Sequence, residues 1–187
     1  SGPNPESVAA VSTALARQYP GTLLAIELFP AANTTQGWGA PPDPAAYARL
    51  LQSTRAAIQS AQSDVTLIAA GLTPLSSNPV PGDMDDLAFL AGLYEAGGRE
   101  DMPVISIRLP ALSGDPLASP TAGSPPYLRH FEAIRQIMLN YGHEQGLLWI
   151  SGFAWPSEYS DAQAQADWLV QAYELLQARL YLGAAFF

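Results

Sequence analysis

The chain has 187 residues, of which 48% are hydrophobic and 13% charged, and this length and composition fit one globular domain over residues 1–187. Its 17 acidic residues outnumber its 8 basic residues, all of them arginine, and the net charge of −9 disfavours nucleic acid as a partner because phosphate binding needs clustered cations. The absence of cysteine excludes disulfide bonds, thiolate metal sites and cysteine nucleophiles. No apolar run approaches the roughly 18 residues that span a bilayer, so we expect no membrane insertion of this segment. We interpret residues 1–3 as an expression scar.

Amphipathic helices alternate with short apolar strands along the whole chain. Helices are predicted from apolar residues at helical spacing between cap residues and glycine or proline stops, and strands from short apolar runs. In chain order the pattern predicts a helix over 5–19, a strand over 23–29, a helix over 43–61, a strand over 65–72, a helix over 83–97, a strand over 104–109, a helix over 127–141, a strand over 147–153, a helix over 162–180 and a strand over 183–187.

The fold class follows from this alternation. Strands that are apolar on both faces and separated by helices predict a parallel sheet covered by helices. The loops after the strands (30–44, 73–82 and 110–126) are long and rich in proline and glycine, as at the carboxyl-terminal face of a (β/α) barrel, where sites are built. We therefore predict an α/β domain with a partial TIM-barrel-like repeat of about five parallel strands.

The strand and loop over 147–156 carry the most specific pattern of the chain. Trp149-Ile150-Ser151-Gly152-Phe153-Ala154-Trp155-Pro156 resembles the strand of retaining (β/α)8 glycoside hydrolases, of the β-xylosidase-like and cellulase-like kind, that reads W-I-T-E-F-G-W. In those enzymes the glutamate of this strand is the nucleophile. The matching position here is Gly152, which has no side chain.

Two further positions depart from the same group of enzymes. Glu27-Leu28-Phe29-Pro30-Ala31 is similar to the strand W-N-E-P-N that bears the general acid/base, and Phe29 stands at that position. Ile107-Arg108-Leu109-Pro110 is similar to the strand that ends in H-P-Y, and Arg108 replaces the histidine. The resemblance implies a glycoside-hydrolase scaffold that begins at the third helix of the barrel and ends at its eighth strand. Because hydrolysis with retention needs two carboxyl groups about 5–5.5 Å apart, it also implies a catalytically inactive domain that binds a carbohydrate or a protein.

Two carboxylates keep an enzymatic alternative open. Glu27 lies two residues before Phe29 and points to the same face of its strand, so a displaced acid is one interpretation and a buried Glu27–Arg108 ion pair is the other. Glu158, in the loop after Pro156, is a second displaced carboxylate. A purely structural or assembly domain is the third interpretation.

Trp38 and Trp155 are the candidate carbohydrate-stacking residues, beside Arg108 and Glu27 as candidate polar ligand-binding residues. Both tryptophans lie in loops at the predicted site face, and each could instead pack its loop against the sheet. Trp149 and Trp168 are expected in the core.

The sequence offers no catalytic metal or cofactor site. His130 and His143 lack the spacing of a metal-ligand pair, and no glycine-rich nucleotide-binding motif is present. The triplet Asn33-Thr34-Thr35 has the pattern of a glycosylation acceptor.

A sheet of five strands leaves edges that a closed barrel of eight would not have. We expect these edges to be masked by loops, by a protein partner or by self-association. A glycan is the expected ligand. The usual habitat of the resembled enzymes implies a bacterial protein at the cell surface or outside the cell.

Overall fold

The computed structural model describes residues 2–61, 63–75, 79–119, 127–158 and 161–187. The strands are β1 (Ala25–Leu28), β2 (Thr66–Leu72), β3 (Val104–Leu109), β4 (Leu147–Phe153) and β5 (Leu182–Ala185). The helices are α1 (Pro5–Gln18), α2 (Thr35–Trp38), α3 (Pro44–Ser60), α4 (Asp86–Glu95), α5 (His130–Asn140) and α6 (Ala162–Gln177), with a 3-10 helix, η1 (Gly98–Asp101). The sequence did not predict α2 or η1, both of which are single turns.

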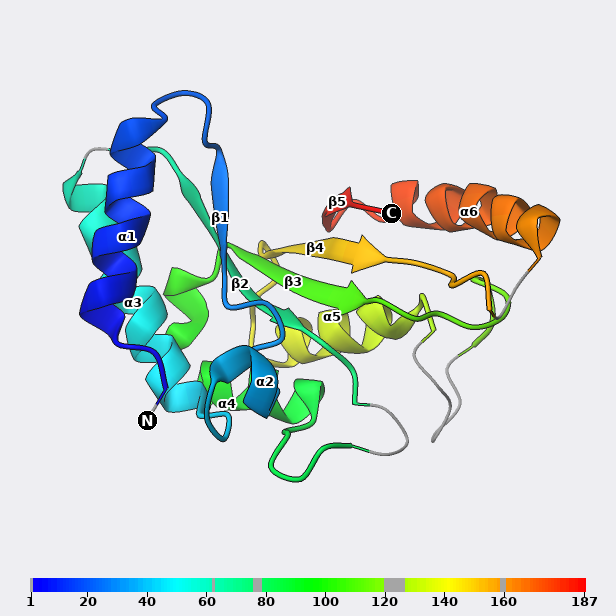
Figure 1. Ribbon diagram of the computed structural model, residues 1–187, viewed down its shortest axis with the longest axis horizontal. Helices are drawn as coiled ribbons and strands as arrows, with labels where there is room; N and C mark the ends of the chain where they lie inside the picture. Colours follow the sequence, from blue (N-terminus) through cyan, green and yellow to red (C-terminus); the bar gives the residue numbers. More distant parts are fainter. Residues whose placement is uncertain (1, 62, 76–78, 120–126, 159–160) are drawn as a thin grey trace.

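The strands form one parallel sheet in the order β1-β2-β3-β4-β5, so each strand pairs with its neighbours in sequence. Figure 1 shows α1 beside α3 at one end of the molecule and α6 beside β5 at the other. The predicted α/β fold with about five parallel strands and flanking helices is confirmed.

Side-chain caps define where the helices begin. Asn4, Asp43, Asp85 and Asp161 each accept a hydrogen bond from the backbone N–H three residues later, at the start of α1, α3, α4 and α6. The carboxylate of Asp85 therefore caps α4.

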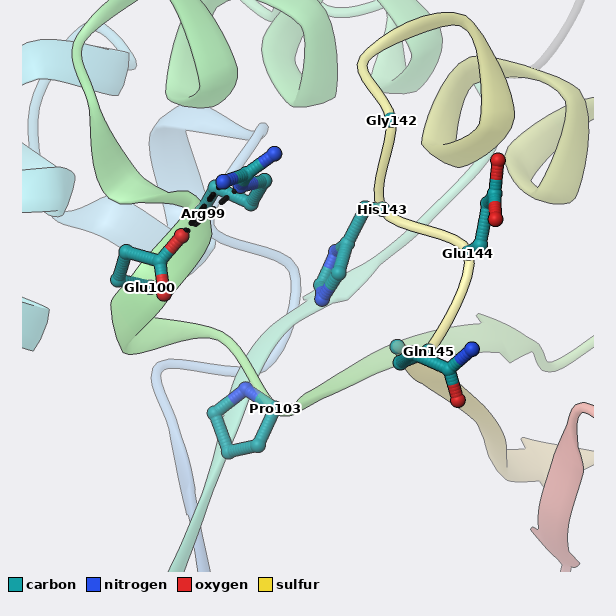
Figure 2. A pocket seen from close by; sticks show the side chains of 8 residues that line it. Arg99, Glu100, Pro103, Gly142, His143, Glu144 and Gln145 are labelled. Atoms are coloured by element: carbon teal, nitrogen blue, oxygen red, sulfur yellow. Dashed lines mark hydrogen bonds and ion pairs between the residues drawn. The ribbon is translucent and has the colours of Figure 1, made fainter.

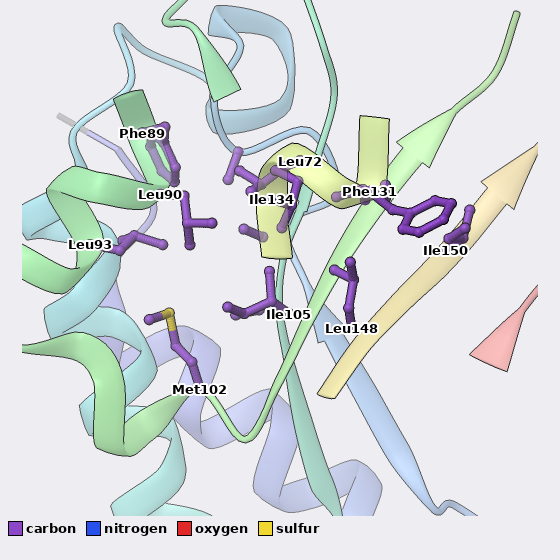
Figure 3. Packing of buried hydrophobic residues seen from close by; sticks show 14 of the residues in the cluster. Leu72, Phe89, Leu90, Leu93, Met102, Ile105, Phe131, Ile134, Leu148 and Ile150 are labelled. Carbon is purple, nitrogen blue, oxygen red and sulfur yellow. The ribbon is translucent and has the colours of Figure 1, made fainter. Parts of the chain in front are cut away.

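The main core lies between the sheet and the helices that cover one of its faces. Figure 3 shows side chains of β2, β3 and β4 meeting those of α4 and α5. Ile105 and Ile107 of β3 and Ile150 of β4 are 0% exposed on this side. On the opposite face Arg108 is exposed and Trp149 only half-buried, so this face of the sheet is partly open.

α1 packs on α3 through a face that the sequence pattern did not predict. Its buried residues are Ala9, Ser12 and Ala16. Of the apolar stripe that helical spacing indicates (Val8, Val11 and Leu15), Val8 is half-buried against the core, whereas Val11 and Leu15 are 61% and 41% exposed. Small side chains let the two helix backbones approach closely. Val11 and Leu15 therefore remain on the surface.

Candidate functional site

The carboxyl ends of the strands bring two of the predicted positions together. Arg108 and Gly152 are Cα partners in the β3–β4 pairing, just after a shift of register at Ile107. Phe29 directly follows β1, which is separated from β3 by β2. The site is therefore built at the β3–β4 end, and the Phe29 position lies two strands away.

Phe29, the residue that the sequence resemblance places at the general acid/base position, is an apolar ring in a constrained backbone. Its φ of 50° lies in the left-handed region, which non-glycine residues rarely adopt. Its ring is half-buried and meets the Trp38 ring edge-on, with centroids 5.7 Å apart. Phe29 supplies packing here and no titratable group.

Gly152 is a glycine that the backbone does not require. It is absent from the residues with positive φ, and a Cβ built on it would meet only the Nε of Arg108, at 3.9 Å. That distance is ordinary van der Waals contact, so a larger side chain could stand there without displacing backbone. The missing side chain leaves open space beside the guanidinium.

That space is a hollow of about 270 Å³ at the carboxyl ends of β3, β4 and β5. It is lined by Arg108, Pro110, Ser151, Gly152, Phe153, Ala154, Phe186 and Phe187. Arg108 carries the only ionisable side chain among these residues, and residues Phe186 and Phe187 are 51% and 56% exposed. We define this hollow as the Gly152 hollow.

The expected ion pair between Glu27 and Arg108 does not form. The Glu27 carboxylate instead accepts a hydrogen bond of 2.5 Å from the Ser106 hydroxyl, which in turn accepts one of 2.9 Å from the backbone N–H of Gly71. The Arg108 guanidinium has no hydrogen-bond or ion-pair partner among the residues that the structure describes.

Sheet geometry explains this correction. The position along β3, and not its separation of roughly 10 Å from β1, decides which residue of β3 reaches Glu27. Ser106 lies nearer the start of β3 and reaches Glu27, whereas Arg108 lies beyond the register shift and approaches Gly152 on β4. The sequence placed Glu27 and Arg108 on the sheet, but it did not predict that Ser106 would be the partner of Glu27.

Trp38 is covered by its neighbours and presents no ring face to a ligand. It is 2% exposed and packs against Phe29 and Tyr47, and Gly2 supplies part of its cover. The α2 turn, which places it there, begins with Thr34 accepting a hydrogen bond from the N–H of Gly37. The packing interpretation therefore replaces the carbohydrate-stacking one for Trp38.

Trp155 is likewise 2% exposed. Its indole N–H donates to the carbonyl of Gly114 at 3.0 Å, and its ring packs against Phe153 and Trp168. It holds the loop after β3 against the loop after β4, and its stacking role is corrected in the same way. Trp149 and Trp168, expected in the core, are half-buried.

Glu158 lies on the exposed surface of the loop after β4. In the described part of the chain no hydrogen bond or ion pair joins it to Glu27. Glu27 itself is half-buried and bonded to Ser106. The structure thus gives no support for pairing these two carboxylates.

Both histidines belong to pairs that spacing in the sequence did not reveal. His130 Nε2 lies 2.6 Å from Oδ2 of Asp86, joining the first residues of α5 and α4. The Nδ1 of His143 lies 2.9 Å from the Tyr94 hydroxyl. Across residues 2–61, 63–75, 79–119, 127–158 and 161–187 no group of three or more His, Asp or Glu side chains could hold a metal ion.

A larger hollow of about 430 Å³ surrounds His143 at the opposite end of the strands (Figure 2). Its walls come from η1 and from the turn between α5 and β4, with Arg99 and Glu100 paired at 2.8 Å on one side. Burial, followed by the charges of Arg99 and Arg135, lowers the pKa of His143. In (β/α) folds this amino-terminal face serves stability, whereas sites lie at the carboxyl-terminal face, so we select the Gly152 hollow.

None of the helices in the described ranges is long and apolar enough to cross a membrane.

Comparison with known proteins supports the fold and leaves the activity open. No protein-family model matches the sequence, and no curated protein matches it. Among solved structures it is similar to a family 39 glycoside hydrolase from the gut symbiont Bacteroides cellulosilyticus WH2, with a TM-score of 0.64 and 20% sequence identity. The match covers 97% of this chain and 38% of that one. The chain therefore has a glycoside-hydrolase-like fold and spans well under half the length of the enzyme it matches.

Proposed function

We propose that this chain is a carbohydrate-binding domain that has the scaffold of a glycoside hydrolase without its hydrolytic activity. The proposal rests on the two replacements that the sequence resemblance implies, at Phe29 and Gly152, and on what the structure has at these positions. The first puts a packed aromatic ring where a general acid would stand, and the second puts open space where a nucleophile would stand. Double displacement needs both carboxyl groups, and neither position supplies one.

The Gly152 hollow supports binding as the remaining role. It lies at the carboxyl ends of parallel strands, where (β/α) proteins place their ligands. Its exposed phenylalanine rings offer apolar faces, and Arg108 offers donors for hydroxyl groups. We place the protein at the cell surface or outside the cell, following the same resemblance.

A substitution that fills the hollow tests binding. Gly152→Phe should abolish glycan binding on an array because its ring would occupy the space, while the fold tolerates a Cβ there. Leu147→Phe is the matched control, since Leu147 is 39% exposed at the other end of the same strand and lies outside the hollow. Equal glycan binding by wild type and Gly152→Phe would contradict the assignment.

The enzymatic alternative has its own test. Incubation with a panel of aryl glycosides should release no phenol above the rate of buffer alone. If release occurs and Glu27→Gln abolishes it, the chain is a glycosidase with a displaced carboxylate. If Glu27→Gln leaves any such release unchanged, the Ser106–Glu27 hydrogen bond has only a structural role.

A further inference from the structure

We propose that Arg108 makes the Gly152 hollow selective for ligands that carry a carboxylate, so that an acidic sugar unit binds in preference to a neutral one. This inference deepens the proposed function and rests on it for the sugar body of the ligand. It would give the site a substrate class that neither the fold nor the resemblance assigns.

The charge of Arg108 is uncompensated. The chain has more than twice as many acidic as basic residues, yet no described carboxylate pairs with this guanidinium. Arg55, Arg99 and Arg129, by contrast, each pair with a carboxylate. An anion from solution can therefore use donors that no internal group occupies.

Geometry directs those donors into the hollow. Arg108 and Gly152 face each other in the strand pairing, and the Nε of Arg108 lies 3.9 Å from where a Cβ of residue 152 would be. From this Cβ position the carboxylate of a glutamate at position 152 would reach the guanidinium of Arg108. With glycine there, a carboxylate of the ligand can take the same place and accept two parallel hydrogen bonds from the planar fork.

The other residues that line the hollow determine the size and polarity of the rest of the ligand. Phe186, Phe187 and Pro110 are apolar, and Ser151 is the single side chain besides Arg108 that carries a polar atom among the lining residues. A volume of about 270 Å³ lies near the lower end of small-molecule pockets. The hollow therefore fits one ring-sized unit with a carboxylate at one end.

The test compares two sugars that differ in one group. Methyl glucuronide and methyl glucoside share their ring and hydroxyl groups, but only the first carries a carboxylate. Titration calorimetry with saturation-transfer NMR should show the glucuronide binding about tenfold or more tightly, because a charge-assisted fork contributes at least that factor. Equal affinity for both sugars, or preference for the glucoside, would overturn the carboxylate selectivity while leaving the proposed function in place.

Variants locate the effect. Arg108→Gln should reduce glucuronide affinity about tenfold or more and leave glucoside affinity almost unchanged. Arg49→Gln, which removes the same charge from an exposed position on α3, should change neither. Gly152→Glu should also reduce glucuronide binding, because its own carboxylate would occupy the guanidinium. Retained selectivity in both Arg108→Gln and Gly152→Glu would exclude Arg108 as the determinant.

Benzoate separates the two proposals. It has a ring and a carboxylate but no sugar hydroxyls. Binding of benzoate in an Arg108-dependent manner without binding of either sugar would support the carboxylate site and contradict the carbohydrate function. Absence of binding by benzoate and glucuronide together would overturn the carboxylate site.

Discussion

The side-chain amide of Asn33 connects three segments at the carboxyl-terminal end of the sheet. Its Nδ2 donates to the carbonyls of Thr73 and Met84, at 2.8 and 2.9 Å, and its Oδ1 accepts from the N–H of Thr73 at 3.0 Å. Asn33 is 0% exposed, so the glycosylation pattern that it begins is not accessible in the folded chain. The loops that follow β1 and β2 are thereby fixed to the segment before α4.

Asn33→Ala should lower the free energy of unfolding by about 2–4 kcal/mol, because it leaves a donor and two acceptors without their partner. Urea denaturation followed by circular dichroism measures this change. The control is Asn140→Ala, since Asn140 is exposed and its amide accepts only from Gln136 on the same helix. If both variants lost a similar amount of unfolding free energy, the hydrogen bonds of Asn33 would stabilise the fold no more than a surface hydrogen bond does.

The Tyr47 hydroxyl bridges β1 and β2 where they separate. It donates to the carbonyl of Leu28 at 2.6 Å and accepts from the N–H of Ala70 at 2.7 Å. Ala70 has a φ of 77°, so its backbone leaves the regular ladder and its N–H needs another partner. Burial raises the pKa of the Tyr47 phenol well above its ordinary value, and the hydrogen bond from Ala70 works in the opposite direction.

Because the pKa of Tyr47 is higher in the folded than in the unfolded chain, the unfolded chain loses this proton first as pH rises. The contribution of the protonated Tyr47 phenol to the free energy of unfolding is therefore fully present below about pH 10. Above that pH it declines by up to about 1.4 kcal/mol per pH unit. Tyr47→Phe should reduce this alkaline slope and cost about 1–3 kcal/mol at pH 7. The control is Tyr19→Phe, because Tyr19 is 51% exposed. In denaturant titrations across this pH range, Tyr19→Phe should change neither the alkaline slope nor the free energy of unfolding at pH 7.

Sequence patterns located the residues of the site better than they located their contacts. The similarity at residues 149–156 and 107–110 placed Gly152 and Arg108 at strand ends, and the strand pairing brings them together. The burial of Trp38 was not predictable, because it depends on the unforeseen α2 turn and on Phe29 across a long loop. Such contacts depend on loop conformation, which apolar periodicity does not encode.

At the scale of elements, apolar runs predicted the strands and apolar periodicity predicted the helices, but of the apolar stripe predicted for α1 only Val8 packs against the core. Hydrophobicity favoured Val11 and Leu15, whereas α3 contacts the small residues Ala9, Ser12 and Ala16. A pattern rule assigns the core side to the most apolar stripe. Packing between two helices also depends on how closely their backbones approach, and alanine permits a closer approach than leucine.

Ala16→Leu should therefore destabilise the chain by about 1–3 kcal/mol, because Ala16 is only 4% exposed and additional methylene groups would separate α1 from α3. Leu15→Ala, one residue earlier, should change the free energy of unfolding by less than about 0.5 kcal/mol because Leu15 is 41% exposed. Urea denaturation of both variants compares the two faces directly. A larger destabilisation by Leu15→Ala than by Ala16→Leu would show that α1 packs through its more hydrophobic face.

At the scale of the whole molecule, the sheet ends in two edges that carry exposed apolar residues. At the β1 end these are Leu24 (73% exposed), Val11 of α1 (61%) and Tyr19, which caps α1 (51%). Beside β5 they are Val170 of α6 (60%), Leu180 (96%) and Phe186 (51%). The sequence predicted the number of strands but not how the edges are covered, because closure depends on partners outside the periodic pattern.

The two edges differ in how well they resist pairing with another strand. β1 contains Glu27 and is followed by Pro30, whereas residues 180–187 contain no charged side chain and no proline. Charged residues and proline are the usual protection of an edge strand, so the β5 edge is the less protected one. We therefore predict self-association through β5, against the general repulsion of a net charge of −9.

Sedimentation velocity at increasing protein concentration should reveal species heavier than the 19.8 kDa monomer, and added salt should favour them by screening the repulsion. Leu180→Lys should shift the distribution towards monomer, because lysine beside an edge strand opposes pairing and Leu180 has almost no packing to lose. Leu24→Lys makes the same change at the β1 edge and should leave association unchanged. A monomer at every concentration would contradict the prediction, and loss of association in Leu24→Lys alone would assign the contact to the β1 edge.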